Sequence, residues 1–116
     1  MPDKSPPCLS PQWFQILLTL SAGEQHGLAI MREVADRTEG TMTLWPGMLY
    51  GNLRRLVDAG LVRETDGPAG APARGGTRRY YQITAAGRTA CTAEARRLRR
   101  YVDAARERRV LPQSRP

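Results

Sequence analysis

Residues 46–60 read Pro-Gly-Met-Leu-Tyr-Gly-Asn-Leu-Arg-Arg-Leu-Val-Asp-Ala-Gly, and this run predicts the central helix of the fold. Its apolar side chains recur at helical spacing and define one buried face: Leu49, Leu53, Leu56 and Val57. Proline is tolerated in the first turn of a helix, and glycine commonly follows the last turn, so the run carries both a start and a stop signal. We therefore expect a helix over residues 46–59 whose leucines face the core.

The opposite face of this helix is unusual for a surface that meets only water. The run has a single acid, Asp58, and two internal glycines, Gly47 and Gly51, each of which costs about 1 kcal/mol relative to alanine. Glycine is favoured where another molecule must approach the backbone closely. This face is therefore predicted to contact nucleic acid through Met48, Gly51, Asn52, Arg54 and Arg55.

Positive charge is concentrated in the later part of the chain. Residues 1–40 carry three basic and five acidic side chains, a net charge of −2, whereas residues 41–116 carry fifteen and six, a net charge of +9. The two parts sum to the net charge of +7 of the whole chain. All but one of the basic residues are arginine, whose planar guanidinium suits phosphates and base edges. This asymmetry favours a nucleic-acid partner; the alternative is a merely soluble basic surface.

The length of 116 residues indicates one domain, and an aromatic content of 6% predicts a thin core that a partner chain would complete. No paired carboxylates, nucleophile–base pair or phosphate loop are found, so an enzyme is not expected. Cys8 and Cys91 form no Cys-x-x-Cys pair and His26 is the only histidine, so no metal or cofactor is predicted. We expect a cytoplasmic protein, because no apolar run approaches the roughly 18 residues of a membrane span and no signal peptide is recognisable.

Two helices are predicted before the central one. Residues 1–9 are expected to form a loose arm, and Ser10 and Pro11 give a cap and a first helical residue. The helix that follows has two apolar stripes, one formed by Trp13, Ile16, Leu17 and Leu20 and the other by Phe14 and Leu18. One stripe is expected to face the core of the domain, and the other either a longer helix of this chain or a second protomer. A turn over residues 23–27 separates it from a second helix over about 28–37. His26 is expected to have a capping or turn role there rather than to be a ligand or a base.

A β-wing is predicted after the central helix. Strands are expected over residues 61–65 and 77–84, joined by a loop over residues 66–76 that is rich in glycine and proline. Three arginines at the loop and the strand entrance are predicted to contact phosphate or the minor groove: Arg74, Arg78 and Arg79. The alternative is that the loop only connects the two strands.

The last predicted helix runs over residues 85–109 after Thr84 as its N-cap, and residues 110–116 form a tail. Five small or apolar residues follow a coiled-coil spacing: Cys91, Ala95, Leu98, Val102 and Ala105. Because this seam is short, we expect it to form a dimer interface together with Trp13, Phe14 and Leu17 of the partner chain. The arginines on the rest of the helix form either a solvated face or extra contacts to the DNA backbone.

The order of elements predicts a mainly α fold with a two-stranded β-wing: a winged helix-turn-helix over residues 10–84 plus a C-terminal dimerisation helix. In this plan Arg54 or Arg55 makes a bidentate contact to guanine and Asn52 one to adenine. Two copies would read the half-sites of a palindromic operator about 34–36 Å apart. The alternative is a winged helix that docks on a protein and binds no DNA.

Three motifs resemble the PadR family of bacterial transcriptional regulators: His26-Gly-Leu-x-Ile30, Pro46-Gly-x-Leu-Tyr-x-x-Leu-x-x-Leu-x-x-x-Gly-Leu-Val62, and Arg79-Tyr-Tyr-x-Ile-Thr-x-x-Gly87. The resemblance covers residues 9–105. It implies a homodimeric repressor with Tyr50 near the DNA backbone, and many members respond to a small hydrophobic or phenolic effector.

Two departures from the family pattern concern tryptophan. Trp45 stands where the family often has a serine-type cap, and the last helix contains no tryptophan to form an aromatic drug site. A candidate effector pocket at the dimer interface is instead lined by Trp13, Phe14, Leu17 and Tyr101. The interpretation that the sequence favours is that Trp13 is an ordinary interface aromatic.

Overall fold

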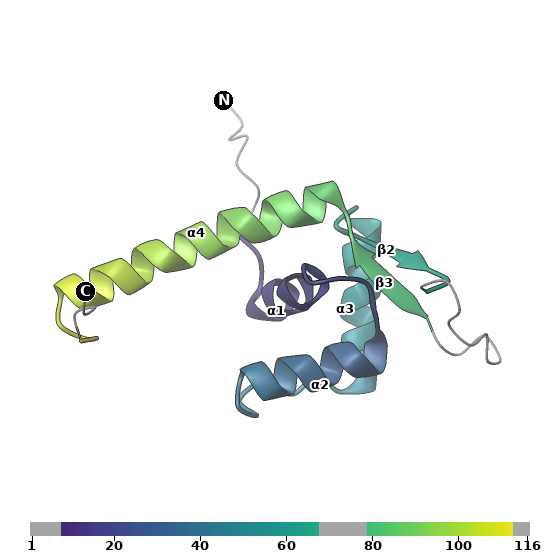
Figure 1. Ribbon diagram of the computed structural model, residues 1–116, viewed down its shortest axis with the longest axis horizontal. Helices are drawn as coiled ribbons and strands as arrows, with labels where there is room; N and C mark the ends of the chain where they lie inside the picture. The colour runs from purple at the N-terminus through teal and green to yellow at the C-terminus, as the bar shows by residue number, and fades with distance from the viewer. Residues whose placement is uncertain (1–7, 68–78, 113–116) are drawn as a thin grey trace.

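Figure 1 shows how helices and short strands are arranged in the computed structural model, which describes residues 8–67 and 79–112. In chain order the elements are α1 (Pro11–Leu20), β1 (Gln25–His26), α2 (Gly27–Arg37), α3 (Pro46–Asp58), β2 (Val62–Thr65), β3 (Tyr80–Ile83) and α4 (Ala85–Glu107). The predicted fold class, a mainly helical winged helix-turn-helix with a further C-terminal helix, is confirmed.

Side chains cap three of the helices at their first turns. The caps are Ser10, His26 and Thr84, which accept hydrogen bonds from the backbone N–H groups of Trp13, Ala29 and Gly87 at 3.1, 3.3 and 3.0 Å. The capping role predicted for His26 is thus confirmed. Helix α3 differs, because Trp45 stands at its N-cap, makes no side-chain cap hydrogen bond and is 66% exposed. Pro46 starts this helix as predicted.

The core lies where α1, α2 and α3 meet the sheet. The leucines of α3 are fully buried, as their spacing predicted: Leu49, Leu53 and Leu56. They pack in one cluster with Ile16, Leu17 and Leu20 of α1 and Ile30 and Val34 of α2. Leu17 was expected at a dimer interface. That expectation is wrong, because its side chain is completely enclosed by its own chain.

The sheet has three antiparallel strands in the order β1-β3-β2. Strands β2 and β3 form the predicted wing pair, with Val62 opposite Ile83 and Thr65 opposite Tyr80. The third strand, β1, adds Gln25 and His26 to the other edge of β3 and was not predicted. Two residues are too few to show the alternation by which a strand is recognised. The predicted positions Arg74 and Arg78 lie outside the described residues.

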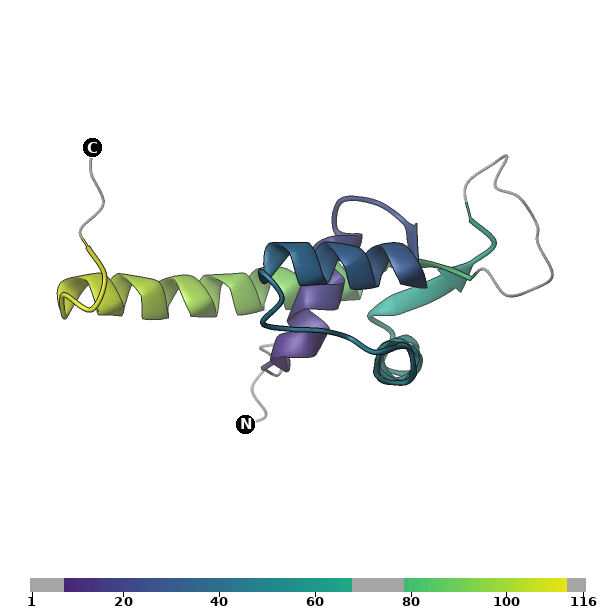
Figure 2. The same ribbon diagram turned by 90° about the horizontal axis from the view of Figure 1, so that it is seen from below.

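Helix α4 packs on the body with its first turns and then extends beyond it (Figures 1 and 2). Ala90, Cys91 and Glu94 are buried against the rest of the chain. Cys91 is therefore part of the core and not of a dimer seam, which corrects the expectation. The N–H of Leu9 donates to Glu94 Oε1 at 3.0 Å, and Leu9 is only 8% exposed. The loose arm therefore does not include residue 9, contrary to the prediction.

The remaining seam positions lie further along α4. Leu98 and Val102 are 38% and 37% exposed, Ala95 is exposed, and Ala105 is half-buried. Within the described residues, no helix combines the length and the apolar character that crossing a bilayer requires.

Candidate nucleic-acid interface

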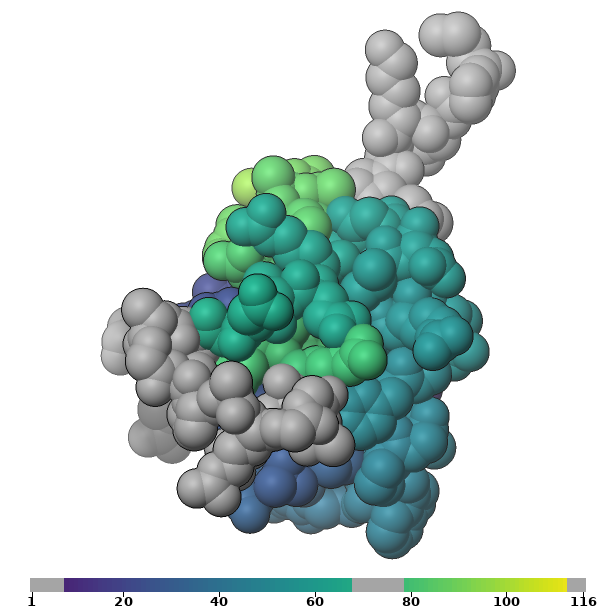
Figure 3. Space-filling model, turned by 90° about the vertical axis from the view of Figure 1, so that its right-hand side faces the viewer, coloured from purple at the N-terminus to yellow at the C-terminus, as the bar shows by residue number. Residues whose placement is uncertain are grey.

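Helix α3 and strand β2 form much of the face of the molecule seen in Figure 3. The side of α3 that carries Arg54 and Arg55 is exposed, while its leucines are at 0% exposure. Met48 and Tyr50 are 39% and 43% exposed, which is high for large apolar side chains in a packed helix. The fold therefore presents arginine, tyrosine and methionine side chains outward from one rigid element.

The glycines of α3 are not required by anything inside the chain. A Cβ built on Gly47 has no atom within 4 Å, and one on Gly51 meets only the guanidinium nitrogens of Arg55 at 3.9 Å. Neither residue is among the glycines with positive φ. Neither packing among the described residues nor backbone conformation requires glycine at these two positions, and their open space leaves room for another molecule to approach the helix backbone.

Asn52 does not lie where the sequence predicted. Asn52 is only 4% exposed, and its side-chain amide makes hydrogen bonds to α1 and within α3. It is therefore not free to contact adenine, and that assignment is wrong. The spacing was misleading because Asn52 lies at the border between the leucine face and the arginine face, where a partner from another helix decides its exposure.

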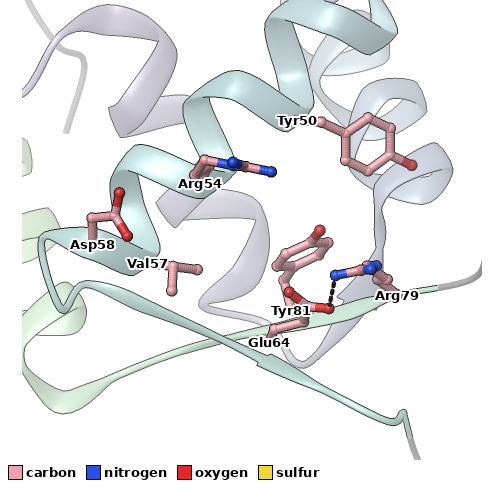
Figure 4. A pocket seen from close by; sticks show the side chains of 7 residues that line it. All are labelled: Tyr50, Arg54, Val57, Asp58, Glu64, Arg79 and Tyr81. Atoms are coloured by element: carbon pink, nitrogen blue, oxygen red, sulfur yellow. Dashed lines mark hydrogen bonds and ion pairs between the residues drawn. The ribbon is translucent and has the colours of Figure 1, made fainter.

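A hollow of about 380 Å³ is lined by residues of α3 and of the sheet (Figure 4). Tyr50 and Arg54 reach it from α3, and Glu64, Arg79 and Tyr81 reach it from the sheet side. Val57 and Asp58 complete the lining. A second hollow of about 270 Å³ lies beside it and is also lined by Tyr50 and Arg79, together with residues of α2 and its cap. Tyr50 and Arg79 thus stand between two concave surfaces.

The charges in the first hollow are partly paired. Arg79 Nη1 donates to Glu64 Oε1 at 2.6 Å, and both side chains remain exposed to solvent, at 59% and 40%. Arg54, from α3, belongs to the same surface and forms no salt bridge with any acid in the described part of the chain. Burial raises the pKa of the Tyr81 hydroxyl, and the Glu64 carboxylate raises it further. Tyr81 therefore stays protonated, and its O–H is available to donate to an anion.

Two of these residues were not singled out from the sequence. The sequence places Tyr81 and Glu64 only within the two expected wing strands. The register explains their meeting, because Glu64 of β2 lies opposite Tyr81 of β3. Alternation along β3 was the available signal for Tyr81, since it lies two residues after a predicted phosphate-binding arginine.

The predicted effector pocket is not formed within one chain. Trp13 lines an apolar hollow of about 430 Å³, whose other lining residues are Cys8, Leu9, Ala59, Leu61, Ala86, Thr89 and Ala90. Phe14 is half-buried against the core, Leu17 is fully buried and Tyr101 is 61% exposed on α4. Of the four expected residues, only Trp13 therefore lines this hollow.

Comparison with known proteins agrees with this architecture. Residues 16–93 match the transcriptional regulator PadR-like family. The structure is similar to the hsRosR-S4 complex, with 30% identity and a TM-score of 0.65 over 88% of this chain and 83% of that one. It is similar to RosR from H. salinarum, with 25% identity and a TM-score of 0.61 over 89% and 96% of the two chains.

A transcriptional regulator from Clostridium thermocellum, Cth-833, has the same fold, with 21% identity and a TM-score of 0.65 over 85% of this chain and 96% of that one. None of the curated proteins is close enough in sequence to count as a match. The family match spans more than half of the chain, and the chain therefore belongs to the PadR-like family of transcriptional regulators, which are DNA-binding regulators and not enzymes.

Proposed function

We propose that this regulator is a homodimeric repressor that reads a palindromic operator with α3 in the major groove and the sheet against the neighbouring phosphates. The observation that carries the proposal is the division of α3 into a fully buried leucine face and an exposed face with two arginines and two glycines. A major groove admits one α-helix, and base edges are read by side chains that extend from it. Bound over a promoter, such a dimer blocks transcription.

The roles of the arginines follow from where they lie. Arg55 extends from the exposed side of α3 and presents the planar donor pair that matches guanine O6 and N7. Arg54 and Arg79 line the hollow between α3 and the sheet, where a phosphate would also meet the O–H groups of Tyr50 and Tyr81. Contacts to phosphate fix the register on the duplex and carry no base information.

Dimerisation is proposed through the part of α4 that leaves the body. Leu98, Tyr101 and Val102 expose apolar surface there, and Val110 and Leu111 extend it beyond the helix. A two-fold dimer would place its α3 helices in successive turns of the groove, about 34–36 Å apart. Such a repressor works where the chromosome is, so the cytoplasm is its proposed location.

An effector that releases the operator is proposed to bind the apolar hollow beside Trp13. The lining is almost wholly apolar and the volume of about 430 Å³ suits a small aromatic or hydrophobic molecule. The indole N–H of Trp13 donates to Asn52 Oδ1 in α3 at 3.1 Å, so a ligand that shifts this ring also acts on the DNA-reading helix.

The test uses fluorescence anisotropy with a duplex operator obtained by selection. Arg55→Ala is expected to weaken operator binding by about 1–3 kcal/mol and to relax the preference at one base pair. Arg54→Ala is expected to weaken binding to all duplexes alike and to lower the salt slope by about one. Both variants binding as tightly as the parent would contradict the assignment. Failure of the parent to bind any duplex at low salt, with a stable complex with another protein, would favour the docking module instead.

A further inference from the structure

A buried amide links the DNA-reading helix to α1. Asn52 Oδ1 accepts from Trp13 Nε1 at 3.1 Å and from Arg55 Nη2 at 3.2 Å. Asn52 Nδ2 donates to Gln12 Oε1 at 3.1 Å and to the backbone carbonyl of Met48 at 3.0 Å. All four hydrogen-bonding positions of the amide are thereby used, at a residue that is 4% exposed.

The chemistry of the partners fixes which way the amide points. An indole N–H and a guanidinium can only donate, so they must meet the amide oxygen. A backbone carbonyl can only accept, so the Met48 carbonyl must meet the amide nitrogen. Turning the amide over would place donor against donor and acceptor against acceptor. Trp13 and Met48 therefore set the oxygen of Asn52 toward Arg55.

Arg55 is exposed, and an exposed arginine ordinarily samples many rotamers. Here one of its terminal nitrogens is held by Asn52, and its guanidinium lies 3.9 Å from the position of a Cβ on Gly51. Only one of its five N–H donors is used by this hydrogen bond, so the remaining ones can be directed outward. The side chain is thus pre-ordered along the exposed face of α3.

We propose that Asn52, oriented by Gln12 and Trp13 of α1, is a positioning residue that holds Arg55 ready to read a base pair. The inference rests on the proposed function, because it assumes that Arg55 contacts DNA. Pre-ordering a charged side chain strengthens a contact by reducing the entropy lost on binding. It favours the one base pair that meets the guanidinium in this orientation, so its effect falls on sequence discrimination.

The experiment compares binding of the selected operator with binding of a duplex in which the base pair read by Arg55 is changed. Asn52→Ala is expected to reduce the ratio of the two affinities about tenfold, since a hydrogen bond to a charged group is lost. Binding to a duplex of unrelated sequence and the salt slope should stay as in the parent. Trp13→Phe, which removes the indole N–H and part of the ring system but keeps an aromatic ring, should lower the same ratio by a smaller factor.

A double-mutant cycle separates positioning from a merely structural role. In an Arg55→Ala background, Asn52→Ala should have no further effect on the ratio. Gln15→Ala is the matched control, because it removes a hydrogen bond between α1 and α2, from Arg37 Nε to Gln15 Oε1 at 2.9 Å, away from α3. It should leave discrimination unchanged.

The indole N–H signals of the two tryptophans report on the network without DNA. Hydrogen exchange at Trp13 should accelerate in Asn52→Ala, while that of the exposed Trp45 stays as it was. The positioning role would be overturned if Asn52→Ala lowered the affinity ratio equally in the parent and Arg55→Ala backgrounds. It would also be overturned if Asn52→Ala lowered the affinity for unrelated DNA as much as that for the operator. If Arg55→Ala itself left discrimination unchanged, the base-reading role in the proposed function would fail, and this inference with it.

Discussion

The ring of Tyr50 occupies the space that a side chain at Gly27 would need. A Cβ built on Gly27 would lie 2.5 Å from the tyrosine Oη and 2.8 Å from Cζ. Gly27 is the first residue of α2, directly after its cap His26, and Tyr50 is on α3. The two helices are therefore interlocked at the point where Tyr50 lines both hollows of the candidate interface.

Gly27→Ala is expected to move Tyr50 and weaken DNA binding about three- to tenfold while changing the stability little. The clash involves the far end of a side chain that is 43% exposed and can swing away, and alanine is itself favourable in a helix. Anisotropy with the operator and urea unfolding would measure the two effects. In a Tyr50→Ala background the substitution should no longer affect binding. An unchanged affinity in the single variant would remove Tyr50 from the interface.

Gly51→Ala is expected to stabilise the protein by about 1 kcal/mol and at the same time to weaken its binding to DNA. The added Cβ would meet only the Arg55 guanidinium, at 3.9 Å, which is an ordinary van der Waals contact that leaves Arg55 in place, so the loss of affinity is expected to come from contact with the external partner. Thermal unfolding measures the expected gain in stability, and titration with the operator measures the expected loss of affinity.

Gly87→Ala is the contrasting variant. Its Cβ would lie 2.0 Å from the Leu61 carbonyl oxygen, so it should destabilise the fold instead. If Gly51→Ala bound the operator as tightly as the parent, close approach of DNA to this part of α3 would be wrong.

Much of the fold follows from local sequence patterns. The leucine spacing of α3 and the caps Ser10 and Thr84 are decided within a few residues of chain. The two wing strands pair over a longer stretch, but they follow one another in the chain and are joined by a single loop. Helical periodicity also fixes which side of α3 is buried, because burying a leucine side chain stabilises the fold by about 1.5–3 kcal/mol.

The expectations that failed depend on residues far apart in the chain. Asn52 has the spacing of an exposed residue, but Gln12 and Trp13, 40 and 39 positions away, enclose its amide. Leu17 and Cys91 have the spacing of interface residues, yet periodicity cannot show whether the same chain or a partner covers an apolar stripe. Tertiary packing decides whether each of these side chains is buried within the chain, and a local sequence pattern cannot predict it.

Glu64→Gln is expected to strengthen binding to duplexes of any sequence about threefold at low salt. The substitution removes a carboxylate 2.6 Å from Arg79 and leaves that arginine to a phosphate. Stability should change by less than about 1 kcal/mol, because the pair is exposed to solvent. The gain should disappear at high salt, where charges are screened.

Glu33→Gln is the matched control for this change in net charge. Glu33 is paired with Arg37 at 3.1 Å on α2, and neither residue lines the hollow between α3 and the sheet. It should give a smaller gain in affinity. Equal gains in affinity from the two variants would mean that the change in net charge alone strengthens binding and that Arg79 has no particular role in contacting phosphate.

The acid sensitivity of the fold is expected to depend on Glu94. The hydrogen bond from Arg97 and then that from the Leu9 N–H lower the pKa of this carboxyl below its ordinary value of 4.5. A lowered pKa in the folded state stabilises at pH values above the unfolded pKa, and the contribution is lost as the pH falls through the folded pKa. The parent should therefore exceed Glu94→Gln in stability by a constant amount above about pH 5.5, and by a shrinking amount below about pH 4.5. Urea unfolding across this range checks it; a difference that stayed constant down to pH 3 would be inconsistent with the pairing.

Reading of DNA by paired copies of α3 is tested by incubating the whole protein with random duplexes, recovering the bound fraction and sequencing it. We expect an inverted repeat whose half-sites are centred about 10–10.5 base pairs apart, and loss of one preferred base pair per half-site when the Arg55→Ala variant is used in place of the parent. Recovered duplexes with the same composition as the starting pool, at low salt and at protein concentrations that saturate dimer formation, would contradict it.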